Sequence, residues 1–125
     1  MIFEIRKYHF EPSLMQAYKQ WAVAKALPYI REHFDLVGFW VNTDEPPEVR
    51  GKALDELGSA TVTWIIRWED MTKRNEVMGK AFRTPEWQEI MKRNPGVENY
   101  HRTEAKFAEQ LWPSIGTDLR DGQLQ

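Results

Sequence analysis

Apolar and polar residues alternate along the first ten residues with the period of a β-strand. Phe3 and Ile5 share one side of this predicted strand, and Glu4, Arg6 and Tyr8 share the other. Such a charged row meets solvent, forms buried ion pairs or lines a pocket. The position of the strand within its sheet therefore decides what the row does.

A helix is predicted to follow the first strand. Ser13 and Gln16 have the spacing of a capping box, and apolar residues recur at helical intervals as far as Ala24. Pro28 lacks a backbone N–H, and its ring clashes with the preceding turn. This proline is therefore expected to kink or end the helix.

Two more strands are predicted in the middle of the chain. Residues 36–41 form an apolar run that is too short for a helix, and this strand is expected to be buried on both faces. Residues 60–68 place alternate apolar side chains on one face. Between them, residues 43–59 carry prolines, glycines and charges, a composition typical of a long loop.

The second half of the chain predicts two short helices and a last strand. Asp70 has the position of an N-cap for the first helix. Thr84 and Pro85 predict the start of the second, with a capping hydroxyl and a proline at the first helical position. Residues 94–96 end that helix, and alternation over residues 98–111 predicts the strand.

The order strand, helix, strand, strand, helix pair, strand is typical of an α+β, ferredoxin-like βαββαβ fold with an antiparallel sheet. Right-handed crossovers place both helical layers on one face and give the strand order fourth, first, third, second. The first strand is then central. We predict one domain over residues 1–112, followed by a polar C-terminal tail over residues 113–125.

The apolar second strand indicates that the uncovered face of the sheet is also buried. Helices of one chain cover only one face, so a second copy packing sheet on sheet is the simplest cover. We therefore predict a homodimer that forms a dimeric α/β barrel. In this geometry Phe3 and Ile5 face the helices, and the polar row of the first strand points into the space between the sheets.

Composition narrows the classes of partner. The net charge of -2, with no run of more than two consecutive Lys or Arg, argues against nucleic acid and anionic membranes. No apolar run approaches the roughly twenty residues that span a bilayer, and no signal peptide precedes the first strand. The chain has no cysteine, which is compatible with the cytoplasmic location that we expect.

Several short motifs occur in an order and spacing that resemble the NIPSNAP family over roughly residues 2–110. They are Glu4-x-Arg6-x-Tyr8, Gly38-Phe39-Trp40, Trp68 to Met71 with Arg74, and Pro85-Glu86-Trp87. The resemblance implies a dimeric α/β barrel. It implies no single reaction, because related barrels include cofactor-free monooxygenases, isomerases, haem-using enzymes and binding proteins.

Two departures from the family weaken any transfer of function. Trp64 stands where many relatives have a histidine in the third strand, which removes a candidate acid, base or metal ligand. The loop over residues 43–59 is also longer than the usual connection. No pair of histidines has metal-ligand spacing, so neither a metal nor a cofactor is predicted.

The candidate catalytic residues are Glu4, Arg6 and Tyr8. Arg6 is suited to anchor an anion and Tyr8 to donate a hydrogen bond. Glu4 has two interpretations: a base whose pKa is raised by desolvation, or the partner of Arg6 in a buried ion-pair network. In such a network Glu4 and Arg6 either face each other or reach Arg102 and Glu104 on the last strand. The candidate ligand-binding residues are Arg6, Tyr8, Trp40, Trp64 and Arg102.

Two functional hypotheses follow. The first is a cofactor-free enzyme of monooxygenase or isomerase type, acting on an aromatic or acidic metabolite in the barrel cavity. The second is a non-catalytic dimeric module that binds a small molecule or a partner. The sequence does not decide whether the protein is an enzyme.

Overall fold

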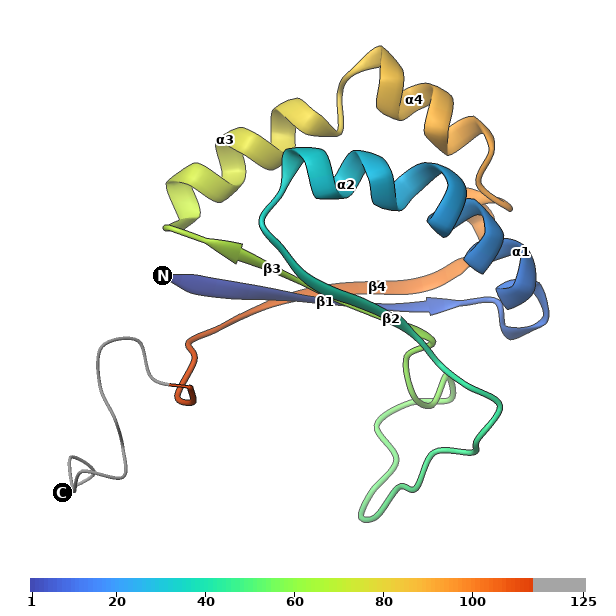
Figure 1. Cartoon of the computed structure of the whole chain (residues 1–125). Coiled ribbons are helices and arrows are strands. Elements are labelled where there is room, and N and C mark those ends of the chain that lie inside the picture. Colours follow the sequence, from blue (N-terminus) through green and yellow to red (C-terminus); the bar gives the residue numbers. More distant parts are fainter. Residues whose placement is uncertain (114–125) are drawn as a thin grey trace, which may run out of the picture.

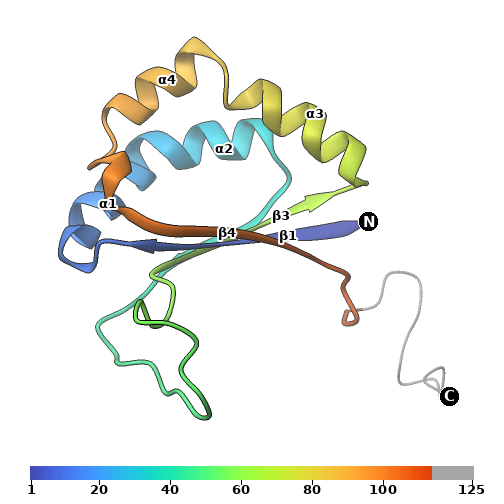
Figure 2. The same ribbon diagram turned by 180° about the vertical axis from the view of Figure 1, so that it is seen from behind.

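The computed structural model describes residues 1–113, and these form a four-stranded antiparallel sheet with all of the helices on one face (Figure 1). The predicted polar tail lies outside the described residues apart from Pro113. Helices on one side leave the other face of the sheet uncovered in the single chain (Figure 2).

The sheet has the strand order β2-β3-β1-β4, which confirms the predicted ferredoxin-like order. Its strands are β1 (Ile2–Phe10), β2 (Leu36–Val41), β3 (Val62–Trp68) and β4 (Tyr100–Ala108). The first strand is central, with antiparallel neighbours on both sides. Strand β2 is the near edge in Figure 1, and β4 is the near edge in Figure 2.

The helical layer consists of two helical stretches. Its α-helices are α1 (Met15–Trp21), α2 (Leu27–His33), α3 (Met71–Ala81) and α4 (Pro85–Lys92). Short 3-10 turns over Pro12–Leu14 and Val97–Asn99 precede α1 and β4. Both stretches lie across the same face of the sheet (Figure 1).

Pro28 does not end the first helical stretch. The chain stays helical from α1 to α2 through a π-helical segment, Ala22–Ala26, in which the Leu27 N–H bonds to the Ala22 carbonyl. A shift to this wider spacing just before a proline accommodates the missing N–H donor and the bulk of its ring. Of the two expected outcomes, a kinked or an ended helix, the helix does not end, because a π-bulge absorbs the disruption and α2 continues to His33.

Two of the predicted helix caps are confirmed, and one is wrong. The Asp70 carboxylate accepts from the Lys73 N–H at 2.8 Å, and the Thr84 hydroxyl accepts from the Trp87 N–H at 3.1 Å. Ser13 does not cap α1. Its N–H and hydroxyl instead donate to Glu11, at 2.9 and 2.6 Å, because the chain first makes a 3-10 turn there.

The predicted orientation of β1 is wrong, because its polar row faces the helices. Glu4 pairs with Ile66, Arg6 with Trp64 and Tyr8 with Val62 across the β1–β3 ladder. Residues directly opposite each other share a face, and these β3 side chains are the buried ones beneath the helices. The buried β3 neighbours, rather than the apolarity of β1 itself, therefore show which face of β1 lies inside.

Phe3 and Ile5 lie on the uncovered face of the sheet, where each is half-buried. Val37 and Trp40 of β2 are about half exposed in the single chain, at 50% and 51%. The second strand is therefore not buried on both faces by its own chain. We call this surface the open face.

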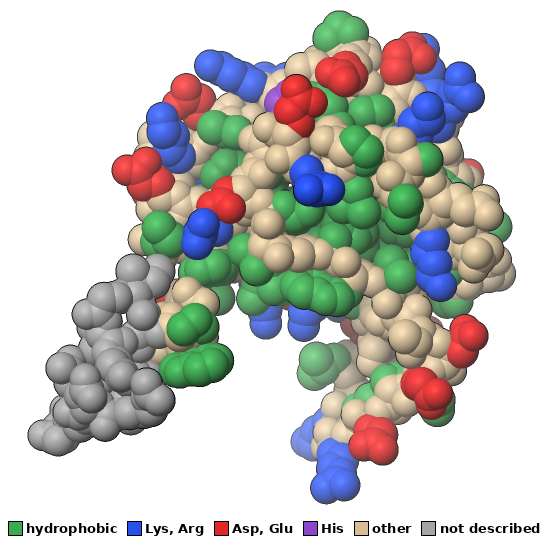
Figure 3. Space-filling model, viewed as in Figure 1, with side chains coloured by type: hydrophobic (Ala, Val, Ile, Leu, Met, Phe, Trp, Pro, Cys, Tyr) green, Lys and Arg blue, Asp and Glu red, His purple; other side chains and the backbone are tan. Residues whose placement is uncertain are grey.

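Residues 42–61 form the long predicted loop, which extends on the side of the sheet away from the helices (Figure 1). Arg102 donates to Asp55 at 2.6 Å, and the His9 ring bonds to the Gly58 carbonyl at 2.9 Å. Together with the bonds of Thr61 to the β1 backbone, these contacts attach the loop to the sheet. Figure 3 shows charged side chains on the helices and along this loop, with hydrophobic ones gathered between the helical layer and the sheet.

Candidate functional site

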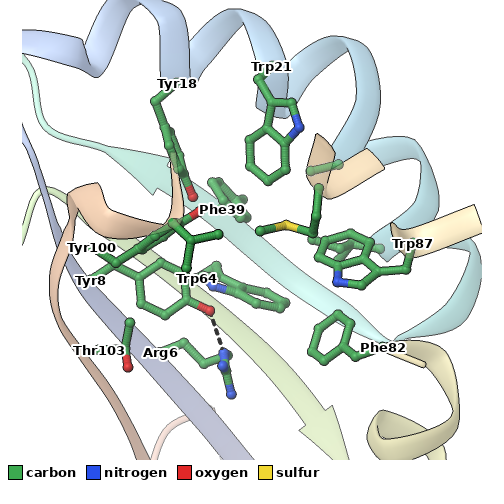
Figure 4. Close-up of a pocket in the computed structure, with 14 residues that line it drawn as sticks. Arg6, Tyr8, Tyr18, Trp21, Phe39, Trp64, Phe82, Trp87, Tyr100 and Thr103 are labelled. Carbon is green, nitrogen blue, oxygen red and sulfur yellow. Dashed lines mark hydrogen bonds between the residues drawn. The ribbon is translucent and has the colours of Figure 1, made fainter. Parts of the chain in front are cut away.

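A cavity of about 410 Å³ lies between the sheet and the helical layer (Figure 4). Aromatic rings from both layers form most of its wall. The lining residues are Arg6, Tyr8, Tyr18, Trp21, Ala26, Ile30, Phe39, Trp64, Phe82, Trp87, Met91, Val97, Tyr100 and Thr103. This volume falls in the range of small-molecule pockets, so the space is large enough for a ligand of one or two rings.

Arg6 is the charged side chain of the lining, and β1 positions it. Its Nε donates to the Tyr8 hydroxyl at 2.7 Å, and its Nη1 donates to Glu4 at 2.7 Å. The guanidinium carbon lies 5.5 Å from the centre of the Tyr8 ring and 5.3 Å from that of the Trp64 ring. These contacts hold the guanidinium group in one orientation with part of it facing the cavity.

Glu4 lies behind Arg6 and is fully buried. Its carboxylate accepts four hydrogen bonds: one from Arg6 at 2.7 Å, two from Arg74 at 2.9 and 2.8 Å, and one from Trp68 at 3.0 Å. Four donors use the acceptor sites of a carboxylate. Glu4 therefore orients Arg6 and is not placed to contact a ligand.

The pKa of Glu4 reflects the same hydrogen bonds and charges. Burial alone raises the pKa of this carboxyl, but the hydrogen bonds and charges of Arg74 and Arg6 outweigh burial and hold it below its usual value. The expectation of a base with a raised pKa was wrong. The ion-pair interpretation of Glu4 and Arg6 describes this site, with Arg74 of α3 as the further partner instead of a residue of the last strand.

Tyr18 of α1 and Tyr100 of β4 form a second polar group at the cavity. The Tyr100 hydroxyl accepts a hydrogen bond from Asn94 at 2.8 Å, and the Tyr18 and Tyr100 rings meet edge to face with centres 6.2 Å apart. Burial raises the pKa of both phenols, so they are protonated at neutral pH. The rings of Tyr8 and Tyr100 meet edge to face with centres 5.5 Å apart, which joins this group to Arg6.

The indole N–H of Trp64 is a buried hydrogen-bond donor in the wall of the same cavity. Its side chain is 2% exposed, and its indole N–H has no hydrogen-bond partner among the described residues. In Figure 4 the nitrogen lies on the edge of the ring turned toward Tyr8. A buried donor without an acceptor is costly, so this N–H favours a ligand that brings a hydrogen-bond acceptor into the cavity.

The structure brings together three of the five predicted ligand-binding residues. Arg6, Tyr8 and Trp64 line the cavity. Trp40 does not, because it pairs with Thr63 on the open face. Arg102 also lies on the open face, where it pairs with Asp55 and Glu104. The prediction that these two residues share a pocket with Arg6 was wrong, because it placed the polar row of β1 on the open face of the sheet instead of the helical face.

Sequence reasoning missed the residues that the helices contribute. Tyr18 and Trp21 lie on the same face of α1, three residues apart, and their spacing predicted a buried stripe without showing that it lines a cavity. Arg74 was noticed as part of a motif but not as a partner of Glu4. Its pairing joins residues 70 positions apart, which no local spacing shows.

Among residues 1–113 no group of three or more His, Cys, Asp or Glu side chains is placed to hold a metal ion. No helix in this part of the chain is long and apolar enough to cross a membrane. The chemistry available at the cavity is therefore that of a guanidinium group, hydroxyls and indoles against aromatic walls.

The model of the NIPSNAP family matches residues 3–109. The chain belongs to the NIPSNAP family. This match covers all four strands and the helices between them, so the cavity lies inside the family domain. No curated protein matches the chain.

Solved structures of other NIPSNAP proteins share this fold. An uncharacterised NIPSNAP domain protein from Burkholderia xenovorans superposes with a TM-score of 0.70 at 17% identity, over 92% of this chain and 99% of that one. A NIPSNAP family protein from Agrobacterium tumefaciens gives a TM-score of 0.70 at 18% identity, over 90% and 88%. At such identities the likeness supports the fold and carries no activity across.

Proposed function

We propose that this NIPSNAP protein binds a small, flat, acidic molecule in the cavity between its helices and sheet. The observation that carries the proposal is the placement of Arg6. It is a fixed guanidinium group among aromatic rings, and no carboxylate of the described chain lines the same cavity. Aromatic walls favour a planar ring, and a guanidinium group favours a carboxylate or a similar anion.

The cavity favours binding over base catalysis. The catalytic hypothesis for an isomerase or a cofactor-free monooxygenase used Glu4 as the base, and Glu4 is enclosed by four donors. No other carboxylate and no histidine belongs to the described lining. A reaction in this cavity would therefore depend on stabilising the charge of the substrate rather than on a protein base.

A titration tests this proposal. Isothermal calorimetry with 2-naphthoate and with 2-naphthalenemethanol compares an acid and a neutral alcohol of the same ring system. We expect the acid to bind more tightly. Arg6→Met should weaken acid binding about tenfold or more, because one charge-assisted contact contributes at least about 1.5 kcal/mol.

Arg31→Met is the matched control, since Arg31 is exposed on α2 and away from the cavity lining. This variant should bind like the unaltered protein. Equal affinity of the acid and the alcohol, or an Arg6→Met protein that binds the acid as before, contradicts the proposal.

We also propose that two chains pack open face to open face. The proposal is supported by the half-exposed Val37 and Trp40, by the half-buried Phe3, Ile5 and Ile65 beside them, and by the dimeric barrel that the family resemblance implies. An exposed apolar sheet face is typical of an interface. In this arrangement the ligand cavity belongs to each chain separately, because it lies on the helical side of the sheet. We keep the cytoplasm as the proposed location.

A further inference from the structure

The polar groups around Tyr8 include one cation, Arg6, and several hydrogens that no hydrogen bond within the described residues uses. We infer that the cavity holds its ligand as a conjugated oxyanion, an enolate or a phenolate, and favours that form over the protonated acid. This inference rests on the proposed function and names the chemistry of the ligand more narrowly. The protein uses some of the hydrogen-bond donors around the cavity itself, and the remaining donors are free to bind a ligand.

Arg6 and Tyr8 each have a hydrogen left for a ligand. Two nitrogens of Arg6 are used by Tyr8 and Glu4, and its Nη2 has no acceptor among the described residues. The Tyr8 hydroxyl accepts from Arg6 at 2.7 Å and gives its own hydrogen to no described residue. Because a hydroxyl has one hydrogen and two lone pairs, a Tyr8 already bonded to a cation is suited to donate.

The Tyr100 hydroxyl also has a hydrogen left to donate. Its oxygen accepts from Asn94 at 2.8 Å, which uses one lone pair. As with Tyr8, no hydrogen bond that the structure shows among the described residues uses the hydrogen of Tyr100, so this hydroxyl is suited to donate. Trp64 adds its unpartnered indole N–H, which can only donate.

These four donors lie close together. The Tyr8 ring touches all three partners: Tyr100 with centres 5.5 Å apart, Trp64 with centres 6.4 Å apart, and the Arg6 guanidinium 5.5 Å from the ring centre. In Figure 4 the polar atoms of these residues lie on one side of the cavity, with Phe82 and Trp87 across from them.

The described lining offers little to accept a ligand proton. It contains no carboxylate and no histidine, so its side-chain oxygen acceptors are the neutral hydroxyls of Tyr8, Tyr18, Tyr100 and Thr103. A protonated enol or phenol could give its hydrogen only to a neutral hydroxyl, whereas the anion receives charge-assisted hydrogen bonds from the cationic Arg6 and from the neighbouring O–H and N–H donors. On binding, the O–H bond of the acid breaks, its electron pair stays on the ligand oxygen, and the proton passes to water.

A chromophoric acid tests the inference, because the anion of 4-nitrophenol absorbs at longer wavelength than the neutral phenol. Visible titrations over a range of pH give the pKa of the bound dye. We expect it to fall by at least one unit below the value of the free dye, a tenfold preference for the anion. An apolar cavity without these donors would raise it instead, because burial disfavours charge.

Tyr8→Phe and Tyr100→Phe each remove a hydroxyl and keep the ring. Each variant should bring the pKa of the bound dye part of the way back toward the value of the free dye. Tyr29→Phe is the matched control, since the Tyr29 hydroxyl is buried but bonds to Ala81 and Thr84 outside the cavity lining. This control should retain the full shift.

The outcomes separate the inference from the function it rests on. If 2-naphthoate binds through Arg6 but nitrophenol keeps or raises its pKa, or does not displace the naphthoate, the oxyanion inference fails and the proposed function stands. If no aromatic acid binds, both fail.

Discussion

At the scale of single residues, Glu4 and Arg6 have different roles in the site. Glu4 is buried under four donors and fixes the orientation of Arg6, while Arg6 faces the cavity. A buried ion pair is weak evidence for net stability, but removing one member leaves an uncompensated charge. Glu4 is therefore a positioning residue whose loss affects folding and binding together.

Glu4→Gln should lower the free energy of unfolding by about 3 kcal/mol, because it leaves Arg6 and Arg74 without their carboxylate. Urea denaturation measures the loss. Glu104→Gln is the control, since Glu104 only meets Arg102 at 3.5 Å on the open face, and it should cost less than about 1 kcal/mol. Equal losses in the two variants would contradict a structural role for Glu4.

The lowered pKa of Glu4 predicts how stability depends on pH. A carboxyl whose folded pKa lies below its unfolded value of 4.5 contributes stability that is present above 4.5 and is lost as the pH falls through the folded pKa. The unfolding free energy should therefore decrease on acidification below about pH 4.5. Glu4→Gln should decrease less steeply over the same range in urea titrations; identical slopes for the two proteins would rule out this contribution.

At the scale of elements, α3 links the capping of a helix to the site. Asp70 caps its first turn, and Arg74 and Met78 one and two turns later contact Glu4 and Arg6. The sequence predicted this cap and the helix from residue types at fixed spacing. It could not predict that α3 supplies the partner of Glu4, because that contact depends on how the helix lies across the sheet.

Asp70→Ala should lower the unfolding free energy by about 1 kcal/mol, because the Lys73 N–H loses its acceptor. Thr72→Ala is the control, as Thr72 is exposed in the same turn and makes no side-chain bond among the described residues. Thermal unfolding followed by circular dichroism compares the two. A control as destabilised as the cap variant would show that the effect is not capping.

At the scale of the whole molecule, the element order was enough to predict the topology, and the facing of β1 was not. Right-handed crossovers leave one strand order for this series of elements, and it is the order observed. The faces of β1 were assigned by apolarity, and this rule failed because the polar row is buried as an ion-pair and tyrosine network. Only the pairing of β1 with β3 shows which face of β1 is buried.

The open face predicts how the chain assembles. Ile65→Glu places a charge in the middle of the proposed sheet-to-sheet interface and should convert a dimer to monomer in sedimentation equilibrium. Val23→Glu is the control, because Val23 is 69% exposed in the first helical stretch, and it should remain dimeric. A monomer at micromolar concentration for the unaltered protein would contradict the interface.

We propose that the cavity beneath the helices binds a flat acid through Arg6. A crystal structure of the protein soaked in 2-naphthoate tests it most directly. The predicted result is the naphthalene ring between Trp64 and the rings of the helical layer, with its carboxylate within hydrogen-bond distance of Arg6. An empty cavity with the naphthoate bound at the open face would contradict it.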